Sequence, residues 1–197
     1  MKKLLYLTFI CLTVLACKKD DNNTTAPSGT TTTALSIGDT YQGGIIFYLD
    51  GNGGGLIAAT TDQSTECKWG CIGTTISGAD GTAIGTGAQN TIDIEIGCTT
   101  PGTAADICAN LTLEGYSDWF LPSKDELNLM WTNLADSDGD ENSNGLTDPN
   151  NIGGFANYIY WSSTEVQDGA WVQSFINGLQ HLNLKDVNDY VRAVRAF

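Results

Sequence analysis

An apolar run that ends at a cysteine constrains this chain more than any other feature. A Met-Lys-Lys start is followed by the apolar segment Leu4–Ala16, and Cys17 comes next. The segment is too short to span a bilayer, and its basic start and small final residue are typical of a secretory signal peptide. We therefore expect residues 1–16 to be removed and the remaining chain to fold outside the cytoplasm.

The residues around the expected cleavage site, between Ala16 and Cys17, predict a lipid anchor. The order Val14-Leu15-Ala16-Cys17 resembles a bacterial lipobox, in which Cys17 receives lipid and becomes the mature N-terminus. An ordinary secretion signal with a chance cysteine is the alternative. The next residues, Lys18-Lys19-Asp20-Asp21, are similar to a signal that some two-membraned bacteria use for surface display, although a solvated charge run is the alternative interpretation. We expect an outer membrane lipoprotein that faces the cell exterior and contacts the membrane through its lipid.

A tether separates this anchor from the folded domain. Residues 17–34 contain almost no large apolar side chain, so they predict a flexible segment with nothing to bury. The domain then covers residues 35–197, which is enough for one core. The chain from residue 17 has seven basic and 23 acidic residues, a net charge of −16. Such a charge repels nucleic acid and sulfated polysaccharides, so we expect no nucleic-acid partner.

Strand and turn signals predominate in the domain, with two helices in its middle, which predicts an α+β fold. The β-rich run 44–49, the glycine-rich turn 50–55 and the run 56–60 predict a hairpin. Residues 73–103 show no clear period, and we expect a long ordered loop there. The pattern of residues 104–113 predicts the first helix.

The second helix has a clearer start, and a strand-rich tail follows it. Ser123-Lys-Asp-Glu126 forms the pattern of a capping box. Residues 158–197 predict four strands, with Asn177-Gly178 as a two-residue hairpin turn. Trp119 and Trp161 are expected to lie in the core. One of Arg192 and Arg195 is expected to pair with an acidic residue such as Asp118 or Glu126.

Four longer motifs resemble one known family. They are Tyr41-Gln-Gly-Gly-Ile-Ile-Phe-Tyr48, Gly115-Tyr-Ser-Asp-Trp-Phe-Leu-Pro-Ser-Lys-Asp-Glu-Leu127, Tyr160-Trp-Ser-Ser-Thr-Glu165 and Tyr190-Val-Arg-Ala-Val-Arg-Ala-Phe197. Together they are similar to the C-terminal domain of bacterial collagen-like adhesins, which is widespread in surface lipoproteins. The resemblance implies a C-type-lectin-like fold with a twisted antiparallel sheet, two central helices, long loops, and the first and last strands side by side.

The resemblance also implies a function in binding. The named adhesin of the family binds sulfated glycosaminoglycans, which requires basic residues, but this domain has few: Lys68, Lys124, Lys185, Arg192 and Arg195. We therefore expect a non-catalytic surface module that recognises a neutral glycan or a protein. A structural or assembly subunit of the cell envelope without a glycan ligand is the alternative. A groove lined by aromatic residues and loops would favour the first, and a flat apolar patch the second.

Four cysteines outside the signal and the anchor suggest disulfides in an oxidising compartment. Cys67, Cys71, Cys98 and Cys108 allow three complete pairings. Closure of short loops favours Cys67 with Cys71 and Cys98 with Cys108. Cys108 could equally be a buried free thiol. No nucleophile elbow, phosphate loop or histidine-based triad is present, so we do not expect an enzyme.

The run from Asp136 to Asp148 is the only candidate metal site in the sequence. Oxygen-bearing side chains alternate with small residues there, and part of the run has the spacing that opens a calcium loop. The candidate ligands are Asp136, Asp138, Asp140, Asn142, Asn144 and Asp148. The glutamate that completes an EF-hand is missing, and a solvated acidic turn is the alternative. Calcium is the only cofactor that the sequence suggests.

Overall fold

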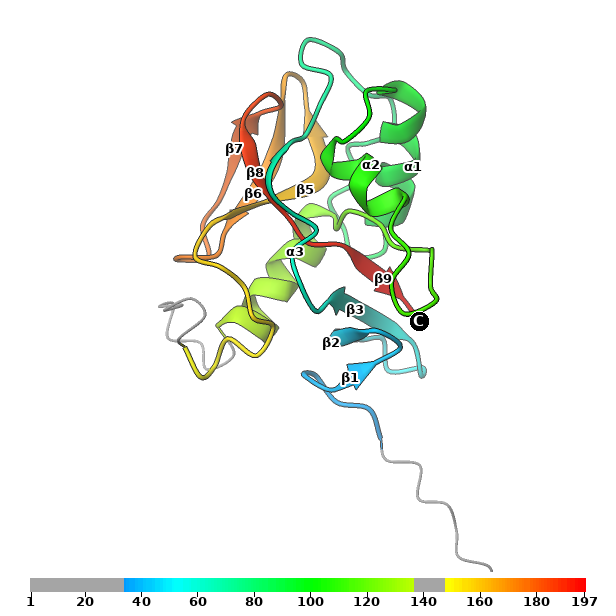
Figure 1. Ribbon diagram of the computed structural model, residues 1–197, viewed down its shortest axis with the longest axis vertical. Helices are drawn as coiled ribbons and strands as arrows, with labels where there is room; N and C mark the ends of the chain where they lie inside the picture. Colours follow the sequence, from blue (N-terminus) through cyan, green and yellow to red (C-terminus); the bar gives the residue numbers. More distant parts are fainter. Residues whose placement is uncertain (1–33, 137–147) are drawn as a thin grey trace, which may run out of the picture. The chain divides into compact units, whose positions relative to one another are not determined.

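Two β-sheets, three α-helices and a π-helical turn make up the described part of the chain in the computed structural model, residues 34–136 and 148–197 (Figure 1). The predicted α+β class is therefore confirmed. The first sheet has the strand order β1-β2-β3-β9 and is antiparallel throughout. Its strands are β1 (Thr40–Tyr41), β2 (Gly44–Leu49), β3 (Gly55–Ala59) and β9 (Val194–Ala196).

The second sheet has the strand order β4-β8-β5-β6-β7. Its strands are β4 (Ser64–Lys68), β5 (Ile159–Val166), β6 (Gly169–Ser174), β7 (Gln180–Leu184) and β8 (Asn188–Val191). β8 runs parallel to β5, with Tyr190 opposite Tyr160, and the other pairs are antiparallel. The expectation of one antiparallel sheet is thus wrong, because the strands divide into two sheets, one of them mixed.

The last stretch of the chain joins these two sheets. Its first half forms β8 in the second sheet, and its second half forms β9 in the first. β9 pairs with β3, with Ile57 opposite Arg195, and β2 lies on the other side of β3. The first and last strands therefore share a sheet. They were expected to lie side by side, but β3 separates residues 44–49 from the last strand.

Both predicted hairpins are present, and one has a longer turn. β2 and β3 form the first hairpin. Between β6 and β7, the Ser174 N–H donates to the Leu179 carbonyl at 2.9 Å, so the turn contains four residues instead of the two expected. A Cβ atom on Gly178 would lie 2.5 Å from the Trp131 ring. The wider turn thus packs closely against the helical segment that follows α3.

The helices are α1 (Gly87–Gly97), α2 (Ala104–Ala109) and α3 (Lys124–Met130), which continues as the π-helical turn η1 (Trp131–Ala135). α2 and α3 confirm the predicted pair. α1 lies within residues 73–103, where a loop was expected, so that prediction is wrong in its second half. The capping box of α3 is confirmed: Ser123 Oγ accepts the Glu126 N–H, and Glu126 Oε2 accepts the Ser123 N–H at 2.7 Å.

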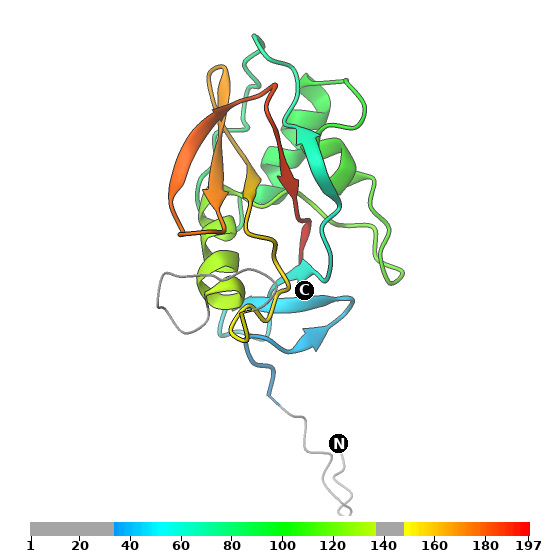
Figure 2. The same ribbon diagram turned by 60° about the vertical axis from the view of Figure 1, so that its left-hand side comes forward.

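The helices pack against the second sheet: α1 contacts β5, α2 contacts β4, and α3 contacts β5 and β6 (Figure 2). α1 and α2 enclose a core around Trp69, Trp119 and Trp161, which confirms the expected burial of the last two. α3 lies between the second sheet and β2, and its side chains pack with Phe47 and Phe155. Among the described residues, no helix has the length and apolar character needed to cross a bilayer.

Candidate functional site

A hollow of about 500 Å³ lies between the β5–β6 hairpin and the long segment that connects β4 to α1. We call it the Trp171 hollow. Its lining residues are Thr75, Ile76, Ser77, Gly78, Asp80, Thr82, Thr164, Glu165, Val166, Gln167 and Trp171. In Figure 1 the connecting segment arches over the end of the second sheet. The hollow is therefore formed by a loop and a hairpin from distant parts of the sequence.

A buried ion pair fastens this loop to the sheet. Lys185 and Glu165 are both buried and form a short salt bridge. Both Glu165 oxygens accept the Ile76 N–H at 2.9 Å, and Lys185 Nζ donates to the Thr74 carbonyl at 2.6 Å. Lys185 Nζ also lies 4.7 Å from the Trp69 ring centroid. Both charges are thus compensated, as burial of ions requires, and both hold the loop.

The rest of the loop is held by its backbone. The Ala79 carbonyl accepts the Glu165 N–H at 2.7 Å, and the Gly81 carbonyl accepts Thr164 Oγ1 and Asn90 Nδ2 at 2.7 Å each. These contacts use backbone groups and leave the intervening side chains for other partners. The exposed ones on the hollow are Thr75, Ser77, Asp80 and Thr82. A fixed backbone thus presents three hydroxyls and a carboxylate to solvent.

Trp171 on β6 supplies an aromatic surface to this hollow. The residue is partly exposed, and Lys124 Nζ lies 4.8 Å from the centroid of its ring. Gln167, at the tip of the β5–β6 turn, adds an exposed amide and has a φ of 53°. Left-handed backbone is uncommon for a residue other than glycine, and such residues cluster at functional sites. Aromatic, amide, hydroxyl and carboxylate groups therefore converge on one hollow.

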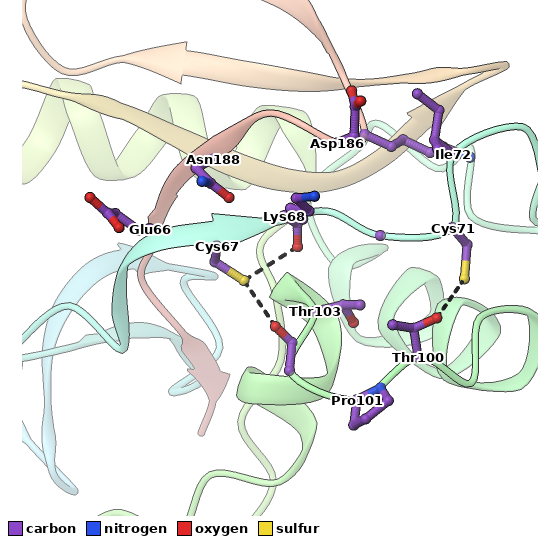
Figure 3. Close-up of a pocket in the computed structure, with 13 residues that line it drawn as sticks. Glu66, Cys67, Lys68, Cys71, Ile72, Thr100, Pro101, Thr103, Asp186 and Asn188 are labelled. Atoms are coloured by element: carbon purple, nitrogen blue, oxygen red, sulfur yellow. Dashed lines mark hydrogen bonds between the residues drawn. The ribbon is translucent and has the colours of Figure 1, made fainter.

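A second hollow, of about 330 Å³, is lined by β4, the start of the same loop and residues 100–103, and Cys71 of the disulfide faces it (Figure 3). Cys71 pairs with Cys98, with their Cα atoms 5.7 Å apart. The favoured pairing of Cys67 with Cys71 and Cys98 with Cys108 is therefore wrong. The bond joins the start of the loop to the end of α1, because the fold brings these distant residues together. Lys185 also lines this hollow, so the buried ion pair supports both.

Cys67 and Cys108 are free and buried. For Cys108 this confirms the alternative of a buried free thiol. Cys67 Sγ donates weakly to the Lys68 and Gly102 carbonyls at 3.3 and 3.4 Å (Figure 3). Burial, assisted by the negative Asp106, raises the pKa of Cys67 to about 11. Burial also raises the pKa of Cys108. Neutral buried thiols of this kind are poor nucleophiles and poor metal ligands.

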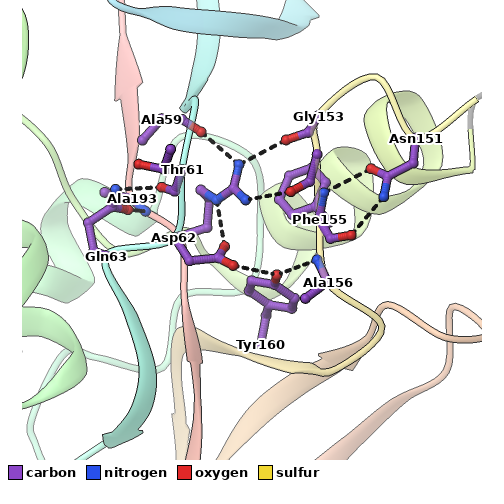
Figure 4. A network of polar contacts seen from close by, with 12 residues as sticks. Ala59, Thr61, Asp62, Gln63, Asn151, Gly153, Phe155, Ala156, Tyr160 and Ala193 are labelled. Carbon is purple, nitrogen blue, oxygen red and sulfur yellow. Dashed lines mark hydrogen bonds and ion pairs between the residues drawn. The ribbon is translucent and has the colours of Figure 1, made fainter. Parts of the chain in front are cut away.

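A third polar cluster surrounds the buried Arg192. Figure 4 shows its partners Ala59, Asp62 and Gly153, with Tyr160 beside Asp62. Arg192 Nε donates to Asp62 Oδ1 at 2.7 Å, and its Nη1 donates to the Ala59 and Gly153 carbonyls. The Tyr160 hydroxyl donates to Asp62 Oδ2 at 3.1 Å. The cluster links the sheets, so we assign it a structural role.

Arg195 forms the ion pair that the sequence predicted. Its Nε makes a short contact with Asp118, and its guanidinium lies 3.9 Å from the Tyr116 ring centroid. Glu126, the other expected partner, instead accepts backbone N–H groups of Gly85 and Ser123. Burial raises the pKa of Glu126, although these hydrogen bonds lower it in part.

The predicted calcium loop lies mostly outside the described residues. Asp138, Asp140, Asn142 and Asn144 belong to the segment 137–147, and only Asp136 and Asp148 are described. Across residues 34–136 and 148–197, no group of three or more histidine, cysteine or acidic side chains is placed to hold a metal ion. The calcium site stays a prediction, as does lipidation of Cys17, which also falls outside.

The Trp171 hollow was not identified from the sequence. A long ordered loop was expected over residues 73–103, and its first half does line the hollow. Trp171 and Gln167 had no distinguishing sequence signal, because a tryptophan in an alternating strand most often belongs to a core. Glu165 ends one of the motifs that resemble the family. Its buried partner Lys185 is 20 residues away in the sequence, so the ion pair was not predicted.

Comparison with known proteins places the chain in a family. The family model described as the Lcl C-terminal domain matches residues 58–195. A search of curated proteins found no match. The match covers both hollows and all strands of the second sheet, and it includes the motifs 115–127 and 160–165 and most of 190–197. The chain therefore belongs to the Lcl C-terminal domain family.

Proposed function

We propose that this domain is a non-catalytic, adhesin-like module that binds a neutral glycan at the Trp171 hollow. The observation that carries the proposal is the convergence of Trp171 with exposed hydroxyl, amide and carboxylate side chains on one loop and hairpin. An aromatic face packs against the apolar face of a sugar ring, and fixed polar groups around it can bind the hydroxyls. Because the buried Lys185–Glu165 pair holds the loop, binding costs little ordering entropy.

The charge of the protein supports a neutral ligand. The net charge of −16 from residue 17 onward opposes a sulfated or otherwise anionic glycan. The exposed carboxylate of Asp80 lies on the hollow itself and would repel an anionic group there. The raised pKa values of the Cys67 and Cys108 thiols support a non-catalytic role. A C-type-lectin-like arrangement is part of the proposal. It is supported by the first sheet, which contains both the first strands and the last strand of the domain, and by the Trp171 hollow, which a long loop helps to form.

Surface display belongs to the same proposal. Lipid on Cys17 would anchor the chain, and residues 18–34 would hold the domain away from the outer membrane. A Cys17→Ser variant should then leave the membrane fraction, while protease added to whole cells should remove the domain of the unaltered protein. Unchanged membrane fractionation of the variant would contradict the lipobox.

A glycan array tests the binding function. The chain from residue 18 onward should bind a defined set of uncharged glycans, and sulfated glycans should give no signal. Trp171→Ala should weaken binding of the best glycan at least tenfold. Tyr158→Ala is the matched control, because Tyr158 is also exposed and aromatic but stacks on Tyr190 outside the hollow. Equal affinity of the Trp171→Ala and unaltered proteins would reject the site.

One observation favours the alternative of a structural or assembly subunit. β7 is an outer strand of the second sheet, and its Leu182 and Leu184 are 47% and 56% exposed. Exposed apolar side chains on an edge strand are typical of surfaces that pair with another chain. If the array shows no ligand, and Leu182→Lys disrupts an assembly seen by analytical ultracentrifugation, the structural role is correct and the glycan function is not.

A further inference from the structure

An apolar strip continues from the Trp171 hollow across β5, β6 and β7. Trp171 on β6 lies opposite Leu182 on β7. Two residues before it, Gly169 lies opposite both Val166 on β5 and Leu184 on β7. Residues directly opposite in antiparallel strands point to the same face of a sheet, as do residues i and i+2 of one strand. We call the four apolar side chains of this face, Val166, Trp171, Leu182 and Leu184, the apolar strip.

The apolar strip is continuous and open to solvent. Val166, Leu182 and Leu184 are 39%, 47% and 56% exposed, and Trp171 is partly exposed. Gly169 is buried in their midst although it has no side chain, so its neighbours leave no gap above it. Scattered exposed apolar residues are common, but adjacent ones form the kind of patch that binds a ligand or a partner.

This strip gives the Trp171 hollow an apolar side. Val166 and Trp171 belong to the lining of the hollow, and the exposed hydroxyls of Thr75 and Ser77 lie on its loop. No side chain of the strip carries a charge. A ligand in the hollow therefore meets polar groups on the loop and an apolar surface towards β7. Such a site is complementary to a molecule with the same division into a polar and an apolar part.

The start of α3 limits the direction in which such a ligand can extend. Gln180 Nε2 donates to the Lys124 carbonyl at 2.9 Å, and Lys124 Nζ lies 4.8 Å from the Trp171 ring centroid. Gln180 is opposite Gln173, the next residue of this face along β6. The start of α3 thus lies over the sheet on that side of Trp171, and the exposed leucines of the strip mark the open side.

We propose that the glycan bound at the Trp171 hollow carries an alkyl tail at its reducing end, as a glycolipid does, and that this tail lies on the apolar strip. The inference rests on the proposed glycan function and names the class of glycan. Removal of the tail and the leucines from water would add affinity beyond that of the sugar.

A second copy of the protein is the competing occupant of the strip. The net charge of −16 from residue 17 onward opposes contact between two copies. An uncharged alkyl tail meets no such repulsion. Pairing of two β7 edges would also use backbone groups, whereas the leucine side chains point out of the face that Trp171 shares. The tail of a ligand that already occupies the hollow therefore fits the strip better.

Matched glycosides test the inference. Isothermal titration of the chain from residue 18 onward would compare the methyl and octyl glycosides of the uncharged glycan that binds best on the array, both below the micelle concentration of the octyl form. We expect the octyl glycoside to bind at least tenfold more tightly. Octyl triethylene glycol, which has the tail without the sugar, should give no saturable binding.

A leucine variant tests the strip itself. Leu182→Ser combined with Leu184→Ser should remove the advantage of the octyl glycoside and change the affinity for the methyl glycoside less than threefold. Circular dichroism should show the native fold, because both leucines are largely exposed. Leu179→Ser is the matched control, since Leu179 is 63% exposed and precedes β7 outside the strip. This change should leave both affinities unaltered.

The outcomes separate this inference from the glycan function. Equal affinities for the two glycosides, or an equal loss for both in the leucine variant, would overturn the inference and leave the glycan function intact. If neither glycoside binds, both fail. Binding of octyl triethylene glycol as tight as that of the octyl glycoside would also overturn the inference, as would a dimer that the leucine variant converts to a monomer in analytical ultracentrifugation.

Discussion

Replacement of Lys185 by methionine tests whether the buried ion pair holds the loop that both hollows share. Methionine fills most of the space of the lysine stem but cannot compensate the charge of Glu165 or donate to the Thr74 carbonyl. Removal of one partner of a buried ion pair costs about 3–5 kcal/mol, because it leaves an uncompensated buried charge. For a domain of this size, that loss corresponds to a decrease of roughly 6–20 °C in melting temperature.

Urea unfolding followed by circular dichroism measures this loss. The double variant Lys185→Met with Glu165→Gln removes the uncompensated charge, so it should recover about 1–3 kcal/mol relative to the single variant. Lys68→Met is the control, because Lys68 lines the hollow beside Cys71, as Lys185 does, but is exposed. It should change stability by less than about 0.5 kcal/mol. A loss below about 1 kcal/mol for Lys185→Met, or a double variant no more stable than the single one, would refute the reasoning.

Three further outcomes follow from the cysteines and the acidic loop. Replacement of both Cys71 and Cys98 by serine should lower the unfolding free energy by about 3–4 kcal/mol, as expected for a 27-residue separation; a loss under about 1 kcal/mol contradicts it. With a pKa of about 11, roughly one Cys67 thiol in a thousand is ionised at pH 8. Ellman's reagent should therefore label Cys67 and Cys108 only in urea, and rapid labelling of the folded chain would contradict their burial. Calcium at about ten times its dissociation constant should stabilise the chain by about 1.4 kcal/mol, and Asp140→Ala should abolish the effect. A melting curve that chelator leaves unmoved would show a solvated turn.

Local signals in the sequence predicted the elements that local contacts determine. The capping box at Ser123 and Glu126 marks the start of α3 because both of its hydrogen bonds lie within four residues. The glycine-rich turn after residue 49 likewise predicted the first hairpin. At Asn177-Gly178 the hairpin itself was predicted, but its turn is longer, because Gly178 packs against Trp131 of another element.

α1 could not be predicted, because distant contacts determine it. It begins and ends with glycine, and its isoleucines occupy every second position, 92, 94 and 96, which is the alternation typical of a strand. Glu126 accepts the Gly85 N–H at 2.7 Å, and a Cβ on Gly87 would lie 2.3 Å from Glu126 Oε2. The glycine is therefore needed for close packing against the start of α3, and the pattern along residues 87–97 contains no trace of this requirement.

For the candidate site, the sequence predicted only that a long ordered loop would be present. The same limit applies to the Cys71–Cys98 bond and the Lys185–Glu165 pair, since both join residues whose proximity is created by the fold. A preference for short disulfide loops treats the chain as flexible. In the folded domain, the direction of the loop after β4 and of α1 decides which sulfur atoms meet.

Chemical-shift mapping of a bound glycan tests the proposed binding function most directly. The ¹⁵N-labelled chain from residue 18 onward would be titrated with the best uncharged glycan from the array. Saturable shifts should appear at the Trp171 indole N–H and at the amides of residues 75–82 and 164–167, which line the hollow. Saturable shifts confined to residues that do not line the Trp171 hollow, or no saturable shifts at all, would contradict a glycan site at Trp171.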